Sequence, residues 1–264
     1  MIDWRYWANN PVAIDCLAIA GWLYALLIGP WRNRIAPGQP FPAAAARRFY
    51  SGLALAYVAV GSPLARTGEL YLFTAHLFQH LLILYPVAAL FLSGLPAWLI
   101  DSAAGSPAIG PVLRAVTRPV PAGLFFILVV TAWHLPKPYE WALAHEWARL
   151  LQYALFLKAG IFFWWPLLSP SRIAPPIGYG QRLAYLFGIE AALTGVYTFI
   201  LMADHAMVPT YEYAPRVLPG FSALNDQILA GMLLSGISSL VLLGALGFNF
   251  FRWASTDRAK SAHS

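Results

Sequence analysis

The chain has 264 residues, of which 59% are hydrophobic and 11% are charged, with a formal net charge of +6. Because a typical soluble domain has about 25% charged residues, this composition excludes a soluble globular protein and predicts an integral membrane protein. The single cysteine, Cys16, excludes an internal disulfide and a metal cluster built from several cysteines.

Seven apolar stretches, each about 17 to 25 residues long, predict seven transmembrane helices. They cover residues 11–30, 49–65, 70–92, 119–135, 147–168, 183–203 and 227–250. Pro86 lies inside the third stretch and is expected to kink that helix. No second domain is indicated, so residues 1–264 are predicted to form one all-α, polytopic membrane domain. The N-terminal residues carry neither a basic region nor a cleavage site, so the first helix is expected to be retained.

Basic residues are distributed unequally between the two ends of the predicted helices. The loops after the first, third and fifth helices and the C-terminal tail hold 11 Lys and Arg residues, including Arg47 and Arg48, whereas the opposite ends hold 5. Cytoplasmic loops carry the excess of Lys and Arg, so the N-terminus is predicted outside and the C-terminus inside. This bias also accounts for the net charge, so no nucleic-acid partner is expected.

His76 and His80 are four residues apart in the third predicted helix. This spacing places both imidazoles on one helix face, one turn apart, where they can hold a metal ion or line a polar pathway. Ionisable side chains in the hydrocarbon region are costly and are usually functional. With the predicted topology, five histidines fall on or toward the outer side of the membrane. They are His76, His80, His134, His145 and His205.

Other polar and sulfur-bearing residues fall at the same predicted depth, but each has a structural explanation as well. Asp204, Asp226, Gln79 and Gln227 are suitable acceptors near the mouth of a cation site. Asp226 equally fits the first turn of its own helix, where the helix dipole favours a negative charge. Met202, Met207 and Met232 are more often gap-filling residues than ligands. Imidazoles bind zinc, copper, iron and nickel, so the spacing alone leaves the metal open.

Several motifs occur together in a fixed order. They are His76-Leu-Phe-Gln-His80-Leu-Leu, Pro86, Gly94-Leu-Pro96, Trp133-His134, Phe163-Trp164-Trp165-Pro166, Asp226-Gln227 and Ala230-Gly231. This ordered set, over about residues 50 to 247, resembles the CtaG-type cytochrome c oxidase assembly factors of the caa3 type. The resemblance implies a seven-helix protein of the bacterial plasma membrane that delivers copper, expected as Cu(I), to a haem-copper oxidase or matures its copper centre.

The resemblance also implies a ligand set and partners. His76, His80 and His134 are the principal expected metal ligands, followed by Asp226 and then by Asp204 and His205. The site would face the extracytoplasmic side. The expected partner is the catalytic subunit of the oxidase, and an extracytoplasmic copper donor is a further candidate.

Two positions depart from the family pattern. The family often has a histidine in the fifth helix, where this chain reads Leu151-Gln152-Tyr153, and a Met-Trp pair in the seventh, where it reads Leu234-Ser235. If those positions bind metal in relatives, this chain has a smaller ligand set.

Lys158 and Glu190 lie in the fifth and sixth predicted helices, which a short loop joins. We expect a buried ion pair between them, in preference to a proton or ion pathway.

No nucleophile, phosphate loop or acid/base pair with catalytic spacing is visible, so we expect a binding and transfer protein and not an enzyme. Two alternatives stay open: a transmembrane cytochrome with histidine ligands, and a transporter for a metal or protons. A retinal protein needs a lysine in its last helix, and residues 227–250 contain none.

Overall fold

The computed structural model of the chain describes residue 7, residues 10–217 and residues 219–261. These residues form helices and no strand, which confirms the all-α class. The elements are α1 (Pro11–Ile28), α2 (Arg32–Ile35), α3 (Ala43–Gly61), α4 (Pro63–Leu70), α5 (Phe73–Leu82), the π-helical turn η1 (Ile83–Val87), α6 (Ala88–Gly94), α7 (Ala97–Gly105), α8 (Gly110–Val116), α9 (Pro119–Trp133), α10 (Pro136–Ala144), α11 (Glu146–Leu168), α12 (Tyr179–Leu201), α13 (Pro209–Tyr213) and α14 (Ala223–Ser261). Arg5, one of the residues in the charge comparison, and His263 lie outside the described residues.

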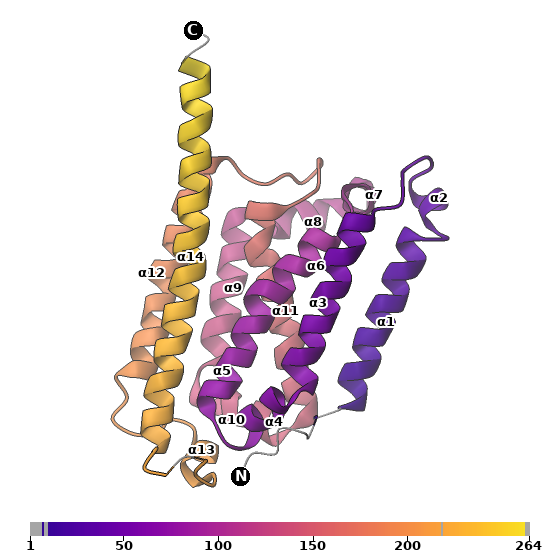
Figure 1. Cartoon of the computed structure of the whole chain (residues 1–264). Coiled ribbons are helices and arrows are strands. Elements are labelled where there is room, and N and C mark those ends of the chain that lie inside the picture. Colours follow the sequence, from indigo (N-terminus) through magenta and orange to yellow (C-terminus); the bar gives the residue numbers. More distant parts are fainter. Residues whose placement is uncertain (1–6, 8–9, 218, 262–264) are drawn as a thin grey trace.

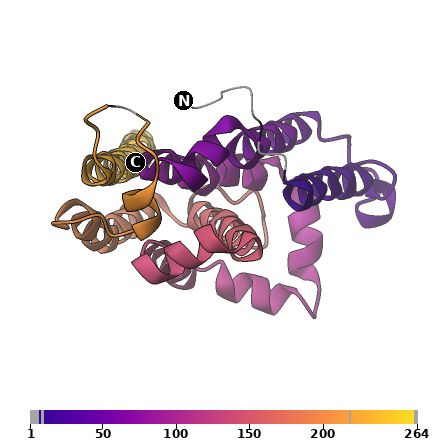
Figure 2. The ribbon, with the colours of Figure 1, turned by 90° about the horizontal axis from the view of Figure 1, so that it is seen from below.

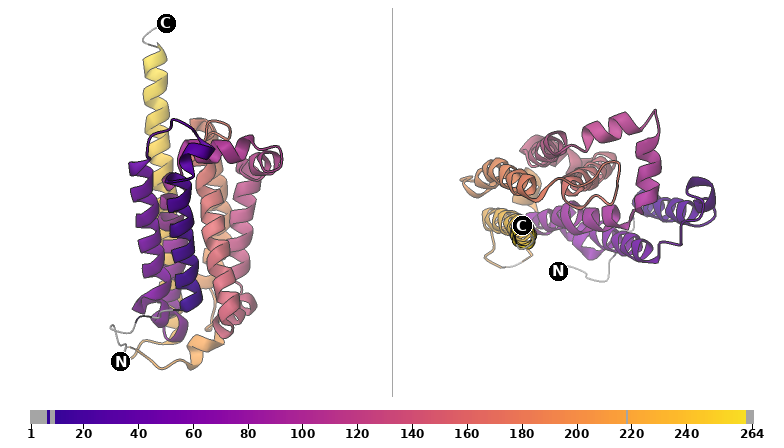
Figure 3. Two further views of the ribbon diagram at one scale, coloured as in Figure 1. Left: turned by 90° about the vertical axis from the view of Figure 1, so that its right-hand side faces the viewer. Right: turned by 90° about the horizontal axis from the view of Figure 1, so that it is seen from above.

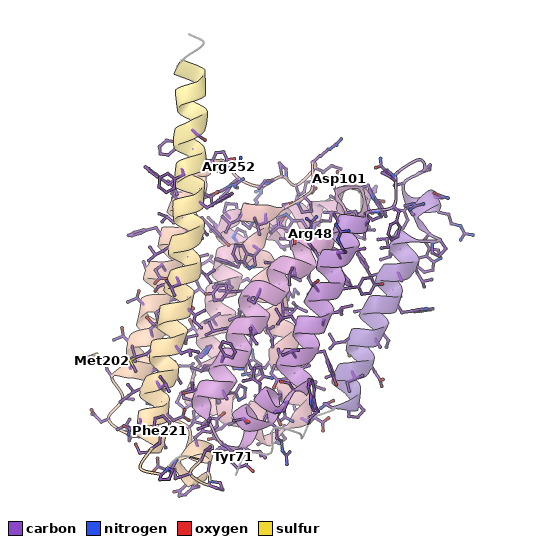
Figure 4. All side chains as sticks on the ribbon, in the orientation of Figure 1. Arg48, Tyr71, Asp101, Met202, Phe221 and Arg252 are labelled. Carbon is purple, nitrogen blue, oxygen red and sulfur yellow. The ribbon has the colours of Figure 1, made fainter. Side chains whose placement is uncertain are left out.

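The long helices run side by side as one bundle, with α5, η1 and α6 forming a single rod (Figure 1). The short helices α4, α10 and α13 cover one end of the bundle, which we call the α10 end, and α2, α7 and α8 lie at the other, the α7 end. Figure 3 shows that α14 extends past its neighbours at the α7 end. Arg48, Asp101 and Arg252 lie toward the α7 end, whereas Tyr71, Met202 and Phe221 lie toward the α10 end (Figure 4).

Five of the described helices are each long and apolar enough to cross a membrane, and α8 with α9, bent by 68°, makes a sixth candidate span. The remaining long helix, α3, contains Arg47 and Arg48 in its first two turns. All seven predicted helices are therefore present as long elements of the bundle. Their orientation relative to the membrane stays a prediction.

Two predicted boundaries around α3 were wrong. The helix begins at Ala43 and not at residue 49, because its alanine-rich start favours helix, so Arg47 and Arg48 are not in a loop. Arg48 Nε donates to the carbonyl oxygen of Ser93 at 2.9 Å, one of the acceptors that the end of α6 leaves free. At its other end, α3 stops at Gly61 because Ser62 and Pro63 begin α4, where the Ser62 hydroxyl accepts from the Leu64 N–H.

The irregularity expected at Pro86 takes the form of the π-helical turn η1. Proline has no N–H to donate, so the regular hydrogen-bond ladder is interrupted there. Helix α11 packs closely on this turn. Trp164 Nε1 donates to the Tyr85 carbonyl oxygen at 3.0 Å, and a Cβ on Gly160 would overlap the Leu84 carbonyl oxygen and lie 2.6 Å from the Ala88 Cβ.

The predicted ion pair between Lys158 and Glu190 was wrong for the described residues. Lys158 is exposed on α11, and its ammonium group lies over the rings of Phe125 and Phe162. Glu190 instead accepts a hydrogen bond from the Ser239 hydroxyl of α14. Neighbouring helices can direct such residues to different faces, which sequence order does not reveal.

Replacing Gly160 with alanine should destabilise the protein by about 1–3 kcal/mol, because the added methyl group overpacks the contact with η1 and α6. Thermal unfolding in detergent measures this. Gly188→Ala in α12 is the matched control, since a Cβ there meets nothing within 4 Å. Equal melting temperatures for the two variants would contradict this packing.

Candidate metal centre

Three imidazoles meet in the interior of the bundle, toward the α10 end. His76 and His80 of α5 are completely buried, and their ring centroids lie 4.5 Å apart. His134, which follows the last residue of α9, is also buried, and its ring centroid lies 5.7 Å from that of His80. The structure thus brings together the three histidines that carried most weight in the sequence.

Hydrogen bonds fix which ring nitrogen carries the proton in two of these histidines. His134 Nδ1 lies 2.6 Å from the Val130 carbonyl oxygen, which can only accept, so Nδ1 is the donor and Nε2 keeps its lone pair.

A hydrogen bond to Tyr211 likewise fixes which ring nitrogen of His76 carries the proton. Tyr211 donates its one hydroxyl hydrogen to the Gly68 carbonyl oxygen at 2.6 Å, so it accepts from His76 Nδ1 at 3.0 Å. His76 Nε2 therefore also keeps its lone pair. Donation from the other ring nitrogen to a protein acceptor is the arrangement usual for histidines that bind metals.

Seven other polar atoms of these side chains and of Gln79 and Gln152 have no hydrogen-bond partner among the described residues. They are His76 Nε2, both ring nitrogens of His80, His134 Nε2, Gln79 Oε1, and both amide atoms of Gln152. Gln152 of α11 is completely buried and lies near the imidazoles of His76 and His80. Buried polar groups without partners are rare in folded proteins, so their concentration in one place is a feature of this site.

Aromatic side chains enclose the cluster. The Phe156 ring lies 4.4 Å from the His80 ring, and Tyr139 of α10 lies 5.0 Å from the His76 ring. Burial raises the pKa of both Tyr139 and Tyr211 well above 10, so both hydroxyls stay protonated at physiological pH. Tyr211 therefore remains a donor to Gly68, which preserves the orientation of His76.

The ring separations can be compared with those of shared metal ligands. A metal about 2.0 Å from a ring nitrogen lies about 3.2 Å from the centroid of that ring. When two rings bind the same ion and the centroid–metal–centroid angle is about 90° to 180°, their centroids are therefore about 4.5 to 6.4 Å apart. Both measured separations fall in this range. No three His, Cys, Asp or Glu side chains within the described ranges are arranged to hold one ion together. No hydrogen bond between described residues holds the His80 ring.

Asp226, a predicted ligand, instead caps a helix. Its carboxylate accepts hydrogen bonds from the N–H groups of Phe73 and Thr74, at 2.6 and 3.1 Å, and from the Thr74 hydroxyl at 2.6 Å. These groups belong to the first turn of α5, where free N–H groups and the helix dipole favour a negative charge. Asp226 therefore joins α14 to α5 and positions the helix that carries His76 and His80.

The other predicted ligands lie away from the cluster. Asp204 and His205 are exposed in the segment between α12 and α13, and His145 is exposed before α11. Met202 and Met232 are 76% and 52% exposed, and Met207 packs against the apolar core. Gln227 holds the Asp204 segment by accepting from the Met207 N–H at 2.7 Å and donating to the Ile200 carbonyl oxygen.

A pocket of about 230 Å³ lies beside the cluster at the α10 end, where Asn10, Arg66, Glu69, Glu146, Arg149 and Tyr153 contribute to its lining. Glu69 pairs with Arg149 at 3.0 Å. Burial raises the pKa of Glu69, and Arg149 opposes this rise. At the inner side, the Tyr153 hydroxyl accepts from Gln79 Nε2 at 2.9 Å, so this pair separates the charged pocket from the histidines.

The family model described as cytochrome c oxidase caa3 assembly factor (Caa3_CtaG) matches residues 22–256. The chain belongs to this family. No curated protein and no solved structure matches it. Membership of the Caa3_CtaG family supports a role in oxidase assembly at a membrane, in agreement with the apolar helices of the bundle.

Several residues that surround the histidines of this Caa3_CtaG member were not predicted from the sequence as part of the site. Gln152 was noted only as a departure from the family pattern, although a polar residue within an apolar stretch is itself a signal. Tyr139, Tyr153 and Tyr211 carry no such signal, because tyrosines are common near membrane surfaces.

Replacing Asp226 with alanine should destabilise the protein by about 1–3 kcal/mol, because several donors at the start of α5 lose a charged acceptor. The free energy of unfolding in detergent, without added metal, measures this loss. Asp204→Ala removes an exposed carboxylate and should leave stability unchanged. A loss seen only in the presence of metal would instead indicate a ligand role for Asp226.

Proposed function

We propose that this assembly factor binds a copper ion among His76, His80 and His134 and transfers it to the copper centre of a haem-copper oxidase. One observation carries the proposal: His76 Nε2, His134 Nε2 and both ring nitrogens of His80 are buried without a hydrogen bond among the described residues, while hydrogen bonds hold the Nδ1 atoms of His76 and His134. Copper is the cargo in this account and not a permanent cofactor.

The charge of the cluster favours a monovalent ion. Its polar side chains are neutral imidazoles, amides and phenols, and the nearby carboxylates are occupied, Asp226 by α5 and Glu69 by Arg149. A cation bound there has no carboxylate to balance it, and an uncompensated charge in a dry interior is costly. Among the metals that imidazole binds, copper is the one readily available as a monovalent ion, so Cu(I) minimises this cost.

The charged pocket offers a route for the ion. Two carboxylates, Glu69 and Glu146, line this pocket together with Arg66 and Arg149, and the Tyr153–Gln79 hydrogen bond stands between the pocket and the histidines. A site with few neutral ligands holds copper less firmly than one with thiolates, which suits an ion that must be released.

Copper binding to the purified protein tests the proposal. We expect about one Cu(I) per chain, and His76→Ala, His80→Ala and His134→Ala should each weaken binding at least about tenfold, since the loss of supporting groups alone costs 10- to 100-fold. The measurement is competition against a Cu(I) chelator in detergent. His145→Ala, which removes an exposed imidazole, is the matched control.

Unchanged affinity in all three variants would refute the site. A Soret band in the purified protein would instead support the cytochrome alternative.

Gln152 provides a gain-of-function test. Its amide is buried beside His76 and His80 without a hydrogen-bond partner, so Gln152→His should add an imidazole ligand in the fifth long helix. We expect Cu(I) affinity to increase about tenfold or more, equivalent to ~1.4 kcal/mol. Gln152→Leu should not produce this increase. Equal affinities in these two variants would place the metal elsewhere.

A further inference from the structure

Lys158 lies near the middle of α11, where its side chain is exposed on the surface of the bundle. It is 12 residues from the start of α11 and 10 from its end, which corresponds to about 18 and 15 Å along the helix axis. A lysine side chain reaches about 6 Å, so its ammonium group cannot reach the water at either end of the helix.

The ammonium group has no anionic partner in the described part of the chain. It lies 5.6 Å from the centroid of the Phe125 ring and 5.8 Å from that of Phe162. The ion pair of Arg149 with Glu69 lies at the α10 end and does not involve Lys158. Lysines at this depth usually pair with a carboxylate or mark a functional site, and two ring faces replace only part of their hydration.

The surroundings of Lys158 form an apolar face. Helix α11 packs against α9 and α10 and against η1 and α6. Leu151, two turns before Lys158 on the same side of α11, is 41% exposed, and Leu128 of α9 is 65% exposed. Figure 2 shows α1 and α9 on opposite sides of α11, with α7 and α8 crossing the corner between them at the α7 end, so the face around Lys158 lies in this corner, below α7 and α8 in the orientation of Figure 1.

We propose that this face binds a transmembrane helix of a partner protein, and that an Asp or Glu near the middle of that helix pairs with Lys158. The apolar surface matches the apolar side chains of a membrane helix. The ammonium group of Lys158, midway along α11, determines how deep that helix lies and which of its residues faces α11. A lipid headgroup would lie too far toward the membrane surface to pair with Lys158.

A second copy of the chain is a poorer match. Its one mid-span carboxylate in the described residues is Glu190, whose Oε1 accepts from Ser239 and whose Oε2 is buried. The partner is therefore a different membrane protein. This proposal does not depend on copper binding.

Site-specific photo-crosslinking in native membranes tests the proposal. A photoreactive phenylalanine analogue at Leu151 should form an adduct with a membrane protein, at a transmembrane segment that contains Asp or Glu. Lys158→Met should reduce this adduct at least tenfold, whereas Lys158→Arg should retain most of it. Replacing the partner's acidic residue with its amide should cause the same loss. The analogue at Phe187, an exposed residue of α12, is the matched control and should not form this adduct.

Three results would overturn the proposal: an adduct unaffected by Lys158→Met, adducts with lipid only, or adducts with a second copy only. Lys158→Met should fold normally, because its side chain is exposed, and its yield in detergent verifies this. Copper affinity of purified Lys158→Met should equal that of the unaltered protein. A failure of the docking proposal is thus separated from a failure of the copper proposal.

Discussion

The central constraint of the structure is the burial of His76, His80 and His134 in a membrane bundle, where several of their ring nitrogens have no hydrogen-bond partner. Three surrounding elements hold them in place. Asp226 of α14 caps α5, Tyr211 of α13 orients His76, and the Val130 carbonyl of α9 orients His134. Each of these contacts fixes a backbone position or a ring tautomer without using Nε2 of His76 or His134. The bundle therefore bears the cost of burying imidazoles while leaving their lone pairs available, which is the property expected of a metal-binding site.

Charged side chains line the pocket at the α10 end, whereas the side chains of the histidine cluster are neutral. Carboxylates and guanidinium groups line the pocket at the α10 end, while the histidines lie behind the Tyr153–Gln79 pair. A cation would pass from this charged, hydrated pocket to a site where only neutral donors are present. A site of neutral ligands in an apolar environment does not bind the ion so tightly that it cannot be released, which suits transfer to another protein. Membership of an oxidase assembly family agrees with an interaction between this protein and the oxidase.

Features carried by local sequence could be predicted, whereas those that depend on the packing of distant segments could not. The four-residue spacing of His76 and His80 places both on one face of a helix, and that face is buried. The capping role of Asp226 could not be predicted, because it depends on the first turn of α5, about 150 residues away in the chain. Lys158 and Glu190 were paired because their helices are consecutive, but the direction in which each side chain points depends on the rotation of its helix. The rotation of a helix about its own axis cannot be read from its hydropathy when the helices that pack against it are unknown.

The most direct measurement is X-ray absorption spectroscopy of the purified chain loaded with one equivalent of Cu(I). The account predicts two or three nitrogen scatterers with the multiple-scattering pattern of imidazole, and loss of that pattern in the His76→Ala, His80→Ala double variant. A shell dominated by sulfur, which would point to Cys16 or to the exposed methionines, would contradict it.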